Sequence, residues 1–147
     1  MVEVKKIVIP VDFTSTMHKV VDYATSIAEQ LGAEIAFFHV INDFQGYDMM
    51  LVHPSFEVMK EDLQKNYEER MAALVEDYKD FKYGVSGKIV TGDAAEEIVK
   101  FAQEQQADLI IIGTHGTKGL ERVLMGSTAE KVVKKATCPT LTFNPFK

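Results

Sequence analysis

The sequence predicts an α/β fold in which helices cover both faces of a parallel β-sheet. Short apolar runs rich in Val and Ile alternate along the chain with longer stretches whose apolar residues recur at helical spacing. Strands separated by helices pair in parallel, because each crossover returns the chain to the same end of the sheet. The chain has 147 residues, of which 46% are hydrophobic, a size and composition typical of one compact domain. We therefore expect a single domain spanning residues 1–147.

The expected strands are five apolar segments bounded by turn or capping residues. They are residues 4–11, 33–41, 85–91, 107–113 and 139–143. The first, second and fourth are strongly apolar, which is typical of strands that are buried on both faces.

Four helical patterns separate these strands. The first is expected to begin at Ser15 or Thr16 and to end at Gly32, a favoured helix terminator. The second covers residues 56–78, the third follows a capping box at Asp93, and the fourth covers residues 123–136. Residues 42–54 are expected to form a loop that is less polar than most.

The composition excludes several function classes. The formal net charge is −6, whereas non-specific nucleic-acid binding requires a basic face. The single cysteine, Cys138, rules out a disulfide within the chain, and we expect it to pack rather than to react. No run approaches the roughly 20 apolar residues that span a bilayer, and residues 1–6 lack the apolar core of a signal peptide. We expect a cytoplasmic protein without membrane insertion or a nucleic-acid partner.

The most informative motif is a set of glycines that follows the apolar run 109–112. Gly113 and Gly116 come first, and Gly126, Ser127 and Thr128 follow after nine further residues. Glycine lets backbone N–H groups approach a ligand closely, and the first N–H groups of a helix attract anions. The spacing is neither the P-loop pattern nor the Rossmann pattern. It predicts a phosphate cradle of another kind.

Other candidate residues fall at the same end of the expected sheet. Asp12 follows the first strand, Val40 lies at the end of the second, and Gly113 follows the fourth. In open parallel sheets, ligands bind outside the carboxyl ends of the strands, at the point where the strand order reverses. These positions therefore predict a nucleotide site at this edge.

Structural alternatives exist for the same residues. Ser127 and Glu130 match a capping box, so Ser127 could simply cap its own helix. Asp12 is a favoured cap and could serve the helix that follows it. The glycines could form ordinary turns.

The cations and histidines give weaker indications. Lys118 and Arg122 lie within the glycine loop, and each fits a phosphate contact as well as a solvated surface. His39 ends an apolar strand and is expected to be a hydrogen-bonded core residue. The other histidines lack the spacing of a zinc site.

Residues 8–12, the pair His39 and Val40, and the glycine pattern together resemble the universal stress protein family over essentially the whole chain. The resemblance implies a five-stranded sheet in the order 3-2-1-4-5, as in the adenine-nucleotide alpha-hydrolase-like fold. It also implies a homodimer joined through the last strand, which comprises Thr140, Leu141, Thr142 and Phe143. An uncharged edge strand needs such a partner or a cover, although Phe143 and Phe146 could instead fold back onto the chain's own helices. The family contains members that bind ATP and members that do not, and the binding members carry the complete glycine pattern found here.

The resemblance further implies a role for each site residue. Pro10 and Val11 would line the base pocket, Asp12 would meet the ribose, the backbone of Val40 would pair with the adenine edge, Gly113 and Gly116 would wrap the sugar and phosphates, and Gly126, Ser127 and Thr128 would hold the phosphates. One departure is Ala129, where some ATP-binding members have a hydroxyl residue. Either Thr128 substitutes for it or one phosphate contact is missing, and Thr114 and Thr117 are further candidates for a second hydroxyl.

These observations favour an ATP-binding regulatory module of the stress response, with Mg²⁺ held by phosphates and water. AMP or ADP as the relevant ligand is left open, as is an unknown protein partner. No general base is evident beside the expected phosphates, so we predict that the protein is not an enzyme. The alternatives are a ligand-free dimeric scaffold and a slow ATP-hydrolysing enzyme of related fold.

Overall fold

The structure is a computed structural model of the 147-residue chain, and it describes residues 1–42, 54–115 and 126–146. Its elements along the chain are β1 (Lys6–Pro10), α1 (Met17–Leu31), β2 (Glu34–Asn42), α3 (Pro54–Asp77), β3 (Val85–Gly92), α4 (Ala94–Glu104), β4 (Leu109–Gly113), α5 (Ser127–Lys135) and β5 (Thr140–Phe143). The five predicted strands are confirmed with boundaries shifted by up to two residues. The last helix begins at Ser127 and not, as expected, at Val123, because Gly126 is extended and caps it; Val123 itself lies outside the described residues.

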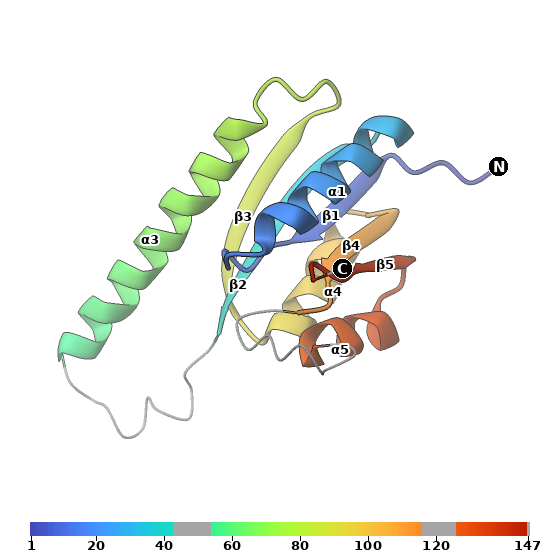
Figure 1. Ribbon diagram of the computed structural model, residues 1–147. Helices are drawn as coiled ribbons and strands as arrows, with labels where there is room; N and C mark the ends of the chain where they lie inside the picture. Colours follow the sequence, from blue (N-terminus) through green and yellow to red (C-terminus); the bar gives the residue numbers. More distant parts are fainter. Residues whose placement is uncertain (43–53, 116–125, 147) are drawn as a thin grey trace.

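The strands form one parallel sheet in the order β3-β2-β1-β4-β5, as predicted (Figure 1). The chain winds outward from β1 in one direction to β3 and then returns to continue through β4 to β5. The reversal lies between β1 and β4, the point at which this kind of sheet binds ligands.

Alternation along the strands divides the core into two layers, because successive side chains point to opposite faces of a sheet. Ile7, Ile9 and Phe37 pack on one face against residues of α1 and α3, including Ala24 and Leu74. The helices α1 and α3 therefore cover one of the two faces, as predicted.

The opposite face carries the second layer. Val8, Phe38 and Ile110 pack there against α4 and α5, where Phe101 stacks on Phe38 with ring centroids 4.1 Å apart. Cys138 is half-buried beside this layer, and burial raises the pKa of its thiol. The structure thus supports a packing role for this cysteine and confirms helices on both faces.

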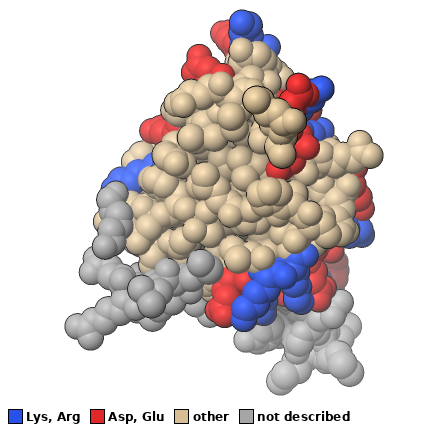
Figure 2. All heavy atoms as spheres, turned by 90° about the vertical axis from the view of Figure 1, so that its right-hand side faces the viewer, with Lys and Arg blue, Asp and Glu red and all other residues tan. Residues whose placement is uncertain are grey.

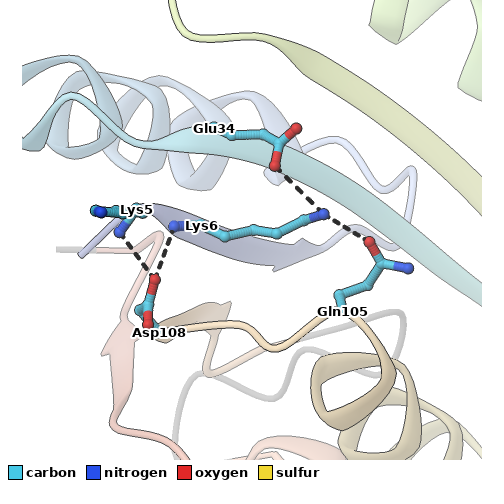
Figure 3. A network of polar contacts seen from close by, with 5 residues as sticks. All are labelled: Lys5, Lys6, Glu34, Gln105 and Asp108. Carbon is cyan, nitrogen blue, oxygen red and sulfur yellow. Dashed lines mark hydrogen bonds and ion pairs between the residues drawn. The ribbon is translucent and has the colours of Figure 1, made fainter. Parts of the chain in front are cut away.

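A polar network ties together the amino-terminal ends of the central strands (Figure 3). Asp108 Oδ2 accepts hydrogen bonds from the backbone N–H groups of Lys5 at 2.9 Å and Lys6 at 3.0 Å. The Nζ of Lys6 lies 2.7 Å from Gln105 Oε1 and 3.3 Å from Glu34 Oε1. This network fixes β1 between β2 and β4 at the edge opposite the carboxyl ends.

β5 ends the sheet, and its hydrogen-bonding phase decides which residues face outward. Ile110 N–H donates to the Pro139 carbonyl, and Thr114 N–H donates to the Phe143 carbonyl. Because backbone groups alternate between the two sides of a strand, the N–H and C=O groups of Thr140 and Thr142 point away from β4. No described strand pairs with that side.

The aromatic residues near this edge dock locally. Phe143 stacks on Tyr23 of α1 with ring centroids 4.8 Å apart, and Leu141 packs against the α1 layer of the core. The ring of Phe146 meets that of His115 edge-on at 5.0 Å. Among the described helices, none is both long and apolar enough to cross a membrane.

Candidate functional site

A cleft of about 640 Å³ opens at the carboxyl ends of β1, β2 and β4. Its walls come from the segment that follows β1, the end of β2, the amino-terminal ends of α4 and α5, and Leu63 and Tyr67 of α3. The reversal of strand order creates this space, because the chain leaves β1 and β4 in opposite directions.

Every described residue of the predicted site lines this cleft. They are Pro10, Val11, Asp12, Val40, Gly113, Gly126, Ser127 and Thr128. Gly116 lies outside the described residues, as do Lys118, Arg122 and Thr117. The structure therefore brings together segments that lie more than a hundred positions apart in the sequence; which ligand they contact stays a prediction.

Asp12 holds the turn that leaves β1. Its Oδ1 accepts hydrogen bonds from the Thr14 N–H at 3.0 Å and from the Thr14 hydroxyl at 2.7 Å. The cap of α1 is Thr16, with no side-chain hydrogen bond, so the alternative in which Asp12 caps that helix is wrong. Oδ2 has no hydrogen-bond partner among the described residues, which leaves one carboxylate oxygen for a ligand.

The amino-terminal end of α5 is capped by Gly126 rather than by Ser127. Ser127 is the first helical residue and makes no capping hydrogen bond, so the capping-box alternative is also wrong. A Cβ built on Gly126 would lie 2.7 Å from the Thr114 carbonyl oxygen, closer than real Cβ atoms come to backbone. Glycine is therefore required here by the contact between β4 and α5, and the uncapped N–H groups of the first helical turn are left for an anion.

Lys131 is a cleft residue that the sequence analysis missed. It lies on α5 one turn after Ser127 and Thr128 and lines the cleft with them. Lys134, on the same helix, is paired with Glu130 at 3.1 Å, whereas Lys131 forms no ion pair with any described residue. Its spacing of three and four residues from the two hydroxyl residues is the pattern that could have indicated a shared helix face.

His39 is buried, as predicted, and it also lines the cleft. Its Nδ1 lies 2.6 Å from the carbonyl oxygen of Val11, and since a carbonyl only accepts, Nδ1 carries the hydrogen. Burial lowers the pKa of His39, which outweighs the opposing effects of the Val11 carbonyl and of Asp12. The ring is therefore neutral near pH 7.

Aromatic contacts fix the plane of the His39 ring. The ring of Phe13 meets it edge-on at 5.2 Å, and the ring of Tyr67 lies 4.5 Å away at a tilt of 34°. Tyr67 belongs to the apolar stripe of α3, so its sequence pattern indicated only packing. Its place at the cleft is decided by how α3 crosses the sheet.

Thr114 and His115 form a second buried polar pair at the cleft. The Thr114 hydroxyl lies 2.7 Å from His115 Nδ1, and both residues line the cavity. Thr114 was one of the hydroxyl residues considered as a substitute at Ala129, and its hydroxyl is engaged by His115. Within the described ranges, no group of three or more His, Cys, Asp or Glu side chains could hold a metal ion.

Comparison with known proteins gives a consistent result. The sequence model of the universal stress protein family matches residues 3–144. The universal stress protein MJ0531 of Methanocaldococcus jannaschii is 35% identical over 137 residues, which cover 93% of this chain and 80% of that protein.

Solved structures agree with the fold. The chain is similar to the structure of MJ0577, a universal stress protein of the same archaeon, with a TM-score of 0.84, 30% identity and 97% of each chain covered. A universal stress protein solved in complex with cAMP has a TM-score of 0.65 at 17% identity, covering 98% of this chain and 99% of that one. At that identity the likeness concerns the fold.

Proposed function

This chain belongs to the universal stress protein family, and from that premise we propose that it is a non-enzymatic module that binds ATP in the cleft at the carboxyl ends of β1, β2 and β4. The observation that carries the proposal is the cleft itself. Aliphatic residues and the Asp12 carboxylate line one side of it, and the other side carries the start of α5 with Lys131, which forms no ion pair with any described residue.

The apolar side of the cleft suits the adenine base of a nucleotide. Pro10, Val11 and Val40 supply aliphatic walls where β1 and β2 end. β1 stops pairing with β2 at Pro10 and Phe38, so no β1 residue is paired with Val40. A planar ring between these walls would meet the backbone edge of Val40, and Asp12 Oδ2 is available to a ribose hydroxyl.

The opposite side suits phosphates. The free N–H groups at the start of α5 carry partial positive charge, and the Ser127 and Thr128 hydroxyls add donors. Lys131 adds a full positive charge. Together these groups offset the absence of a hydroxyl at Ala129 and favour a ligand with several phosphates.

Mg²⁺ would accompany ATP without a protein carboxylate cage. Oxygen ligands suit Mg²⁺, and it commonly keeps waters and binds substrate phosphates. Asp12 and Asp93 both line the cleft, but among the described residues no group of three or more His, Cys, Asp or Glu side chains could form a cage around the ion. Mg²⁺ bound through phosphates and water fits this donor set.

We expect ATP occupancy, rather than turnover, to be the functional output, as suits a stress-response regulator in the cytoplasm. Rapid hydrolysis needs a general base placed beside an attacking water. Asp12 holds a turn through Oδ1, Asp93 caps α4, and His39 donates its Nδ1–H to the Val11 carbonyl, so a structural bond accounts for the position of each side chain.

Calorimetry on nucleotide-stripped protein tests the proposal. We expect ATP with Mg²⁺ to bind once per chain, with ADP, AMP and cyclic AMP as competitors of decreasing charge or altered geometry. The absence of heat and of thermal stabilisation at millimolar ATP, where even about 4 kcal/mol of binding registers, would favour the ligand-free scaffold. A turnover number near the ~10 s⁻¹ of typical enzymes, lost on mutation of Asp12, would favour the enzyme.

The contribution of Lys131 is separable by a matched pair of variants. Lys131→Gln removes a cleft lysine that has no ion-pair partner among the described residues, and Lys134→Gln removes a lysine of the same helix that is engaged by Glu130. We expect the first to weaken ATP binding several-fold and adenosine binding little, and the second to leave both near wild type. Equal losses in the two variants would remove Lys131 from the phosphate site.

We also propose a homodimer in which the β5 edges of two chains pair. Figure 2 shows the side of the molecule on which β5 lies, and the middle of this face is free of Lys, Arg, Asp and Glu among the described residues. The outward N–H and C=O groups of Thr140 and Thr142 offer a ladder to a second copy. Two such edges can pair antiparallel about a two-fold axis.

The phase of β5 selects the variant that tests this dimer. Thr142→Pro removes an outward donor and leaves the bonds to β4, whereas Thr142→Val keeps the donor. We expect wild type and Thr142→Val to have twice the 16.5 kDa chain mass by light scattering, and Thr142→Pro to be monomeric. A monomeric wild type at tens of micromolar would refute the interface.

A further inference from the structure

We propose that His39 is a positioning residue that keeps the backbone N–H of Val40 unpaired, so that the cleft can recognise the edge of an adenine ring. The inference rests on the proposed nucleotide site and adds the device that gives it base selectivity. It follows from the hydrogen-bond phase of β2 and from the two bonds made by the segment after β1.

The hydrogen bonds between β1 and β2 fix which residues of β2 point their backbone groups toward β1. Val11 N–H donates to the Phe38 carbonyl at 2.8 Å, and Glu34 N–H donates to the Lys5 carbonyl at 2.9 Å. Backbone groups alternate between the two sides of a strand, so the N–H and C=O of Val40 face the same side as those of Phe38. That side is the β1 side, where the cleft begins.

If the parallel pairing of β1 with β2 continued by one more step, the N–H and C=O groups of Val40 would both be hydrogen-bonded to the segment after β1. Val40 N–H would donate to the Val11 carbonyl, and Phe13 N–H would donate to the Val40 carbonyl. Neither bond is present among the described residues. The Val11 carbonyl accepts from His39 Nδ1 at 2.6 Å, and Phe13 N–H points to the sulfur of Met17 at 3.3 Å.

The side chains of His39 and Met17 therefore bind the Val11 carbonyl and the Phe13 N–H, which would otherwise pair with Val40. The stronger of the two contacts is that of His39, which is buried and held by the rings of Phe13 and Tyr67. Val40 is 9% exposed and lines the cleft, so the cleft is the side from which solvent or a ligand reaches it. A polar backbone pair that faces the cleft and has no partner among the described residues is suited to a ligand that satisfies both groups.

The arrangement of the pair defines the ligand class. A donor beside an acceptor complements the adenine edge, which presents N1 as an acceptor and the N6 amino group as a donor. Hypoxanthine presents the reverse, an N1–H donor and an O6 acceptor. The Val40 pair should therefore accept adenine nucleotides and reject inosine nucleotides.

The first test needs no nucleotide. Amide hydrogen exchange followed by NMR compares the N–H of Val40 with that of Phe38, which faces β1 within the paired part of the strand. We expect Val40 to exchange much faster in the wild type and to become protected in His39→Leu, where the Val11 carbonyl is released. His39→Asn is the matched control, because its side-chain amide retains a donor near the position of Nδ1.

The second test measures the ratio of ATP to ITP affinity by calorimetry. We expect the wild type to prefer ATP by roughly tenfold or more, His39→Leu to lose most of that preference, and His39→Asn to keep it. A merely structural role for His39 would lower thermal stability in both variants without changing the ratio.

The outcomes separate the two proposals. A wild type in which Val40 is as protected as Phe38, or a His39→Leu variant with unchanged ATP selectivity, overturns the positioning role. A wild type that binds neither nucleotide overturns the proposed function and the ligand part of this inference, while the exchange data still decide whether His39 withholds the Val11 carbonyl. Should His39→Leu fail to fold, slow exchange at Val40 in the wild type or lost selectivity in His39→Asn overturns it.

Discussion

Replacing Gly126 with alanine should both destabilise the protein and weaken ATP binding, because this glycine joins β4 to α5. Its φ of −65° and ψ of 153° suit any residue, so the backbone conformation itself costs nothing. The added Cβ, however, would lie 2.7 Å from the Thr114 carbonyl oxygen. The same carbonyl accepts the Gly126 N–H, so the chain must lengthen or break that hydrogen bond to admit the methyl group.

The magnitude follows from these terms. A lost hydrogen bond costs about 1 kcal/mol, and overpacking against atoms that cannot rotate away costs roughly 1–3 kcal/mol. Replacing glycine also restricts the unfolded chain, which returns about 0.4–1 kcal/mol. We expect a net loss of about 1–3 kcal/mol in the free energy of unfolding, together with weaker ATP binding because the start of α5 moves relative to the cleft.

Gly113→Ala supplies the control. There the Cβ would lie 3.0 Å from a methyl group of Val20, a side chain on α1. We expect a smaller loss, since a side chain can shift where a carbonyl cannot. Urea unfolding and ATP calorimetry on both variants measure the difference. A Gly126→Ala protein with wild-type midpoint and affinity would refute the assignment of Gly126 to close packing at the site.

Three further predictions concern single side chains. Asp12→Asn keeps an acceptor for the turn but removes the charge, so ATP affinity measured by calorimetry should fall by about 1–2 kcal/mol with little change in the urea midpoint. Asp108→Ala removes the acceptor shared by the N–H groups of Lys5 and Lys6 at a partly exposed site, so the free energy of unfolding should fall by about 1–2 kcal/mol, with Asp108→Asn in between. Because burial lowers the pKa of His39 in the folded chain, the unfolded chain binds more protons below about pH 6.5. The free energy of unfolding should therefore fall as the pH drops from 7 toward the folded pKa. Urea titrations across this range measure the fall, and His39→Asn should lack the part that His39 contributes.

The pattern of apolar residues determined most of the fold. Alternation within strands and helical spacing between them depend on local sequence, and both are visible without the structure. The parallel sheet, the helices on both faces and the edge that carries the site all follow from that pattern. The strand order followed from the family resemblance, and the structure confirms it.

The sequence also indicated where the site lies but not how its groups are used. Gly126 and Ser127 both suit the start of a helix, and only the contact of Gly126 with the Thr114 carbonyl shows which of them is the cap. Lys131 looked like one of several surface lysines until α5 was placed against the cleft. Local pattern cannot resolve such cases, because the deciding neighbour lies elsewhere in the chain.

Hydrogen-bond phase is the clearest example of what tertiary structure alone decided. The sequence predicts that residues 139–143 form an edge strand, but whether Leu141 or Thr142 offers its N–H outward depends on the register with β4. In the same way, the Val11 carbonyl, which a longer ladder would have given to the Val40 N–H, accepts from the His39 side chain instead, and Val40 N–H has no backbone partner among the described residues. A shift of one residue in either register would reverse both outcomes while leaving every local pattern unchanged.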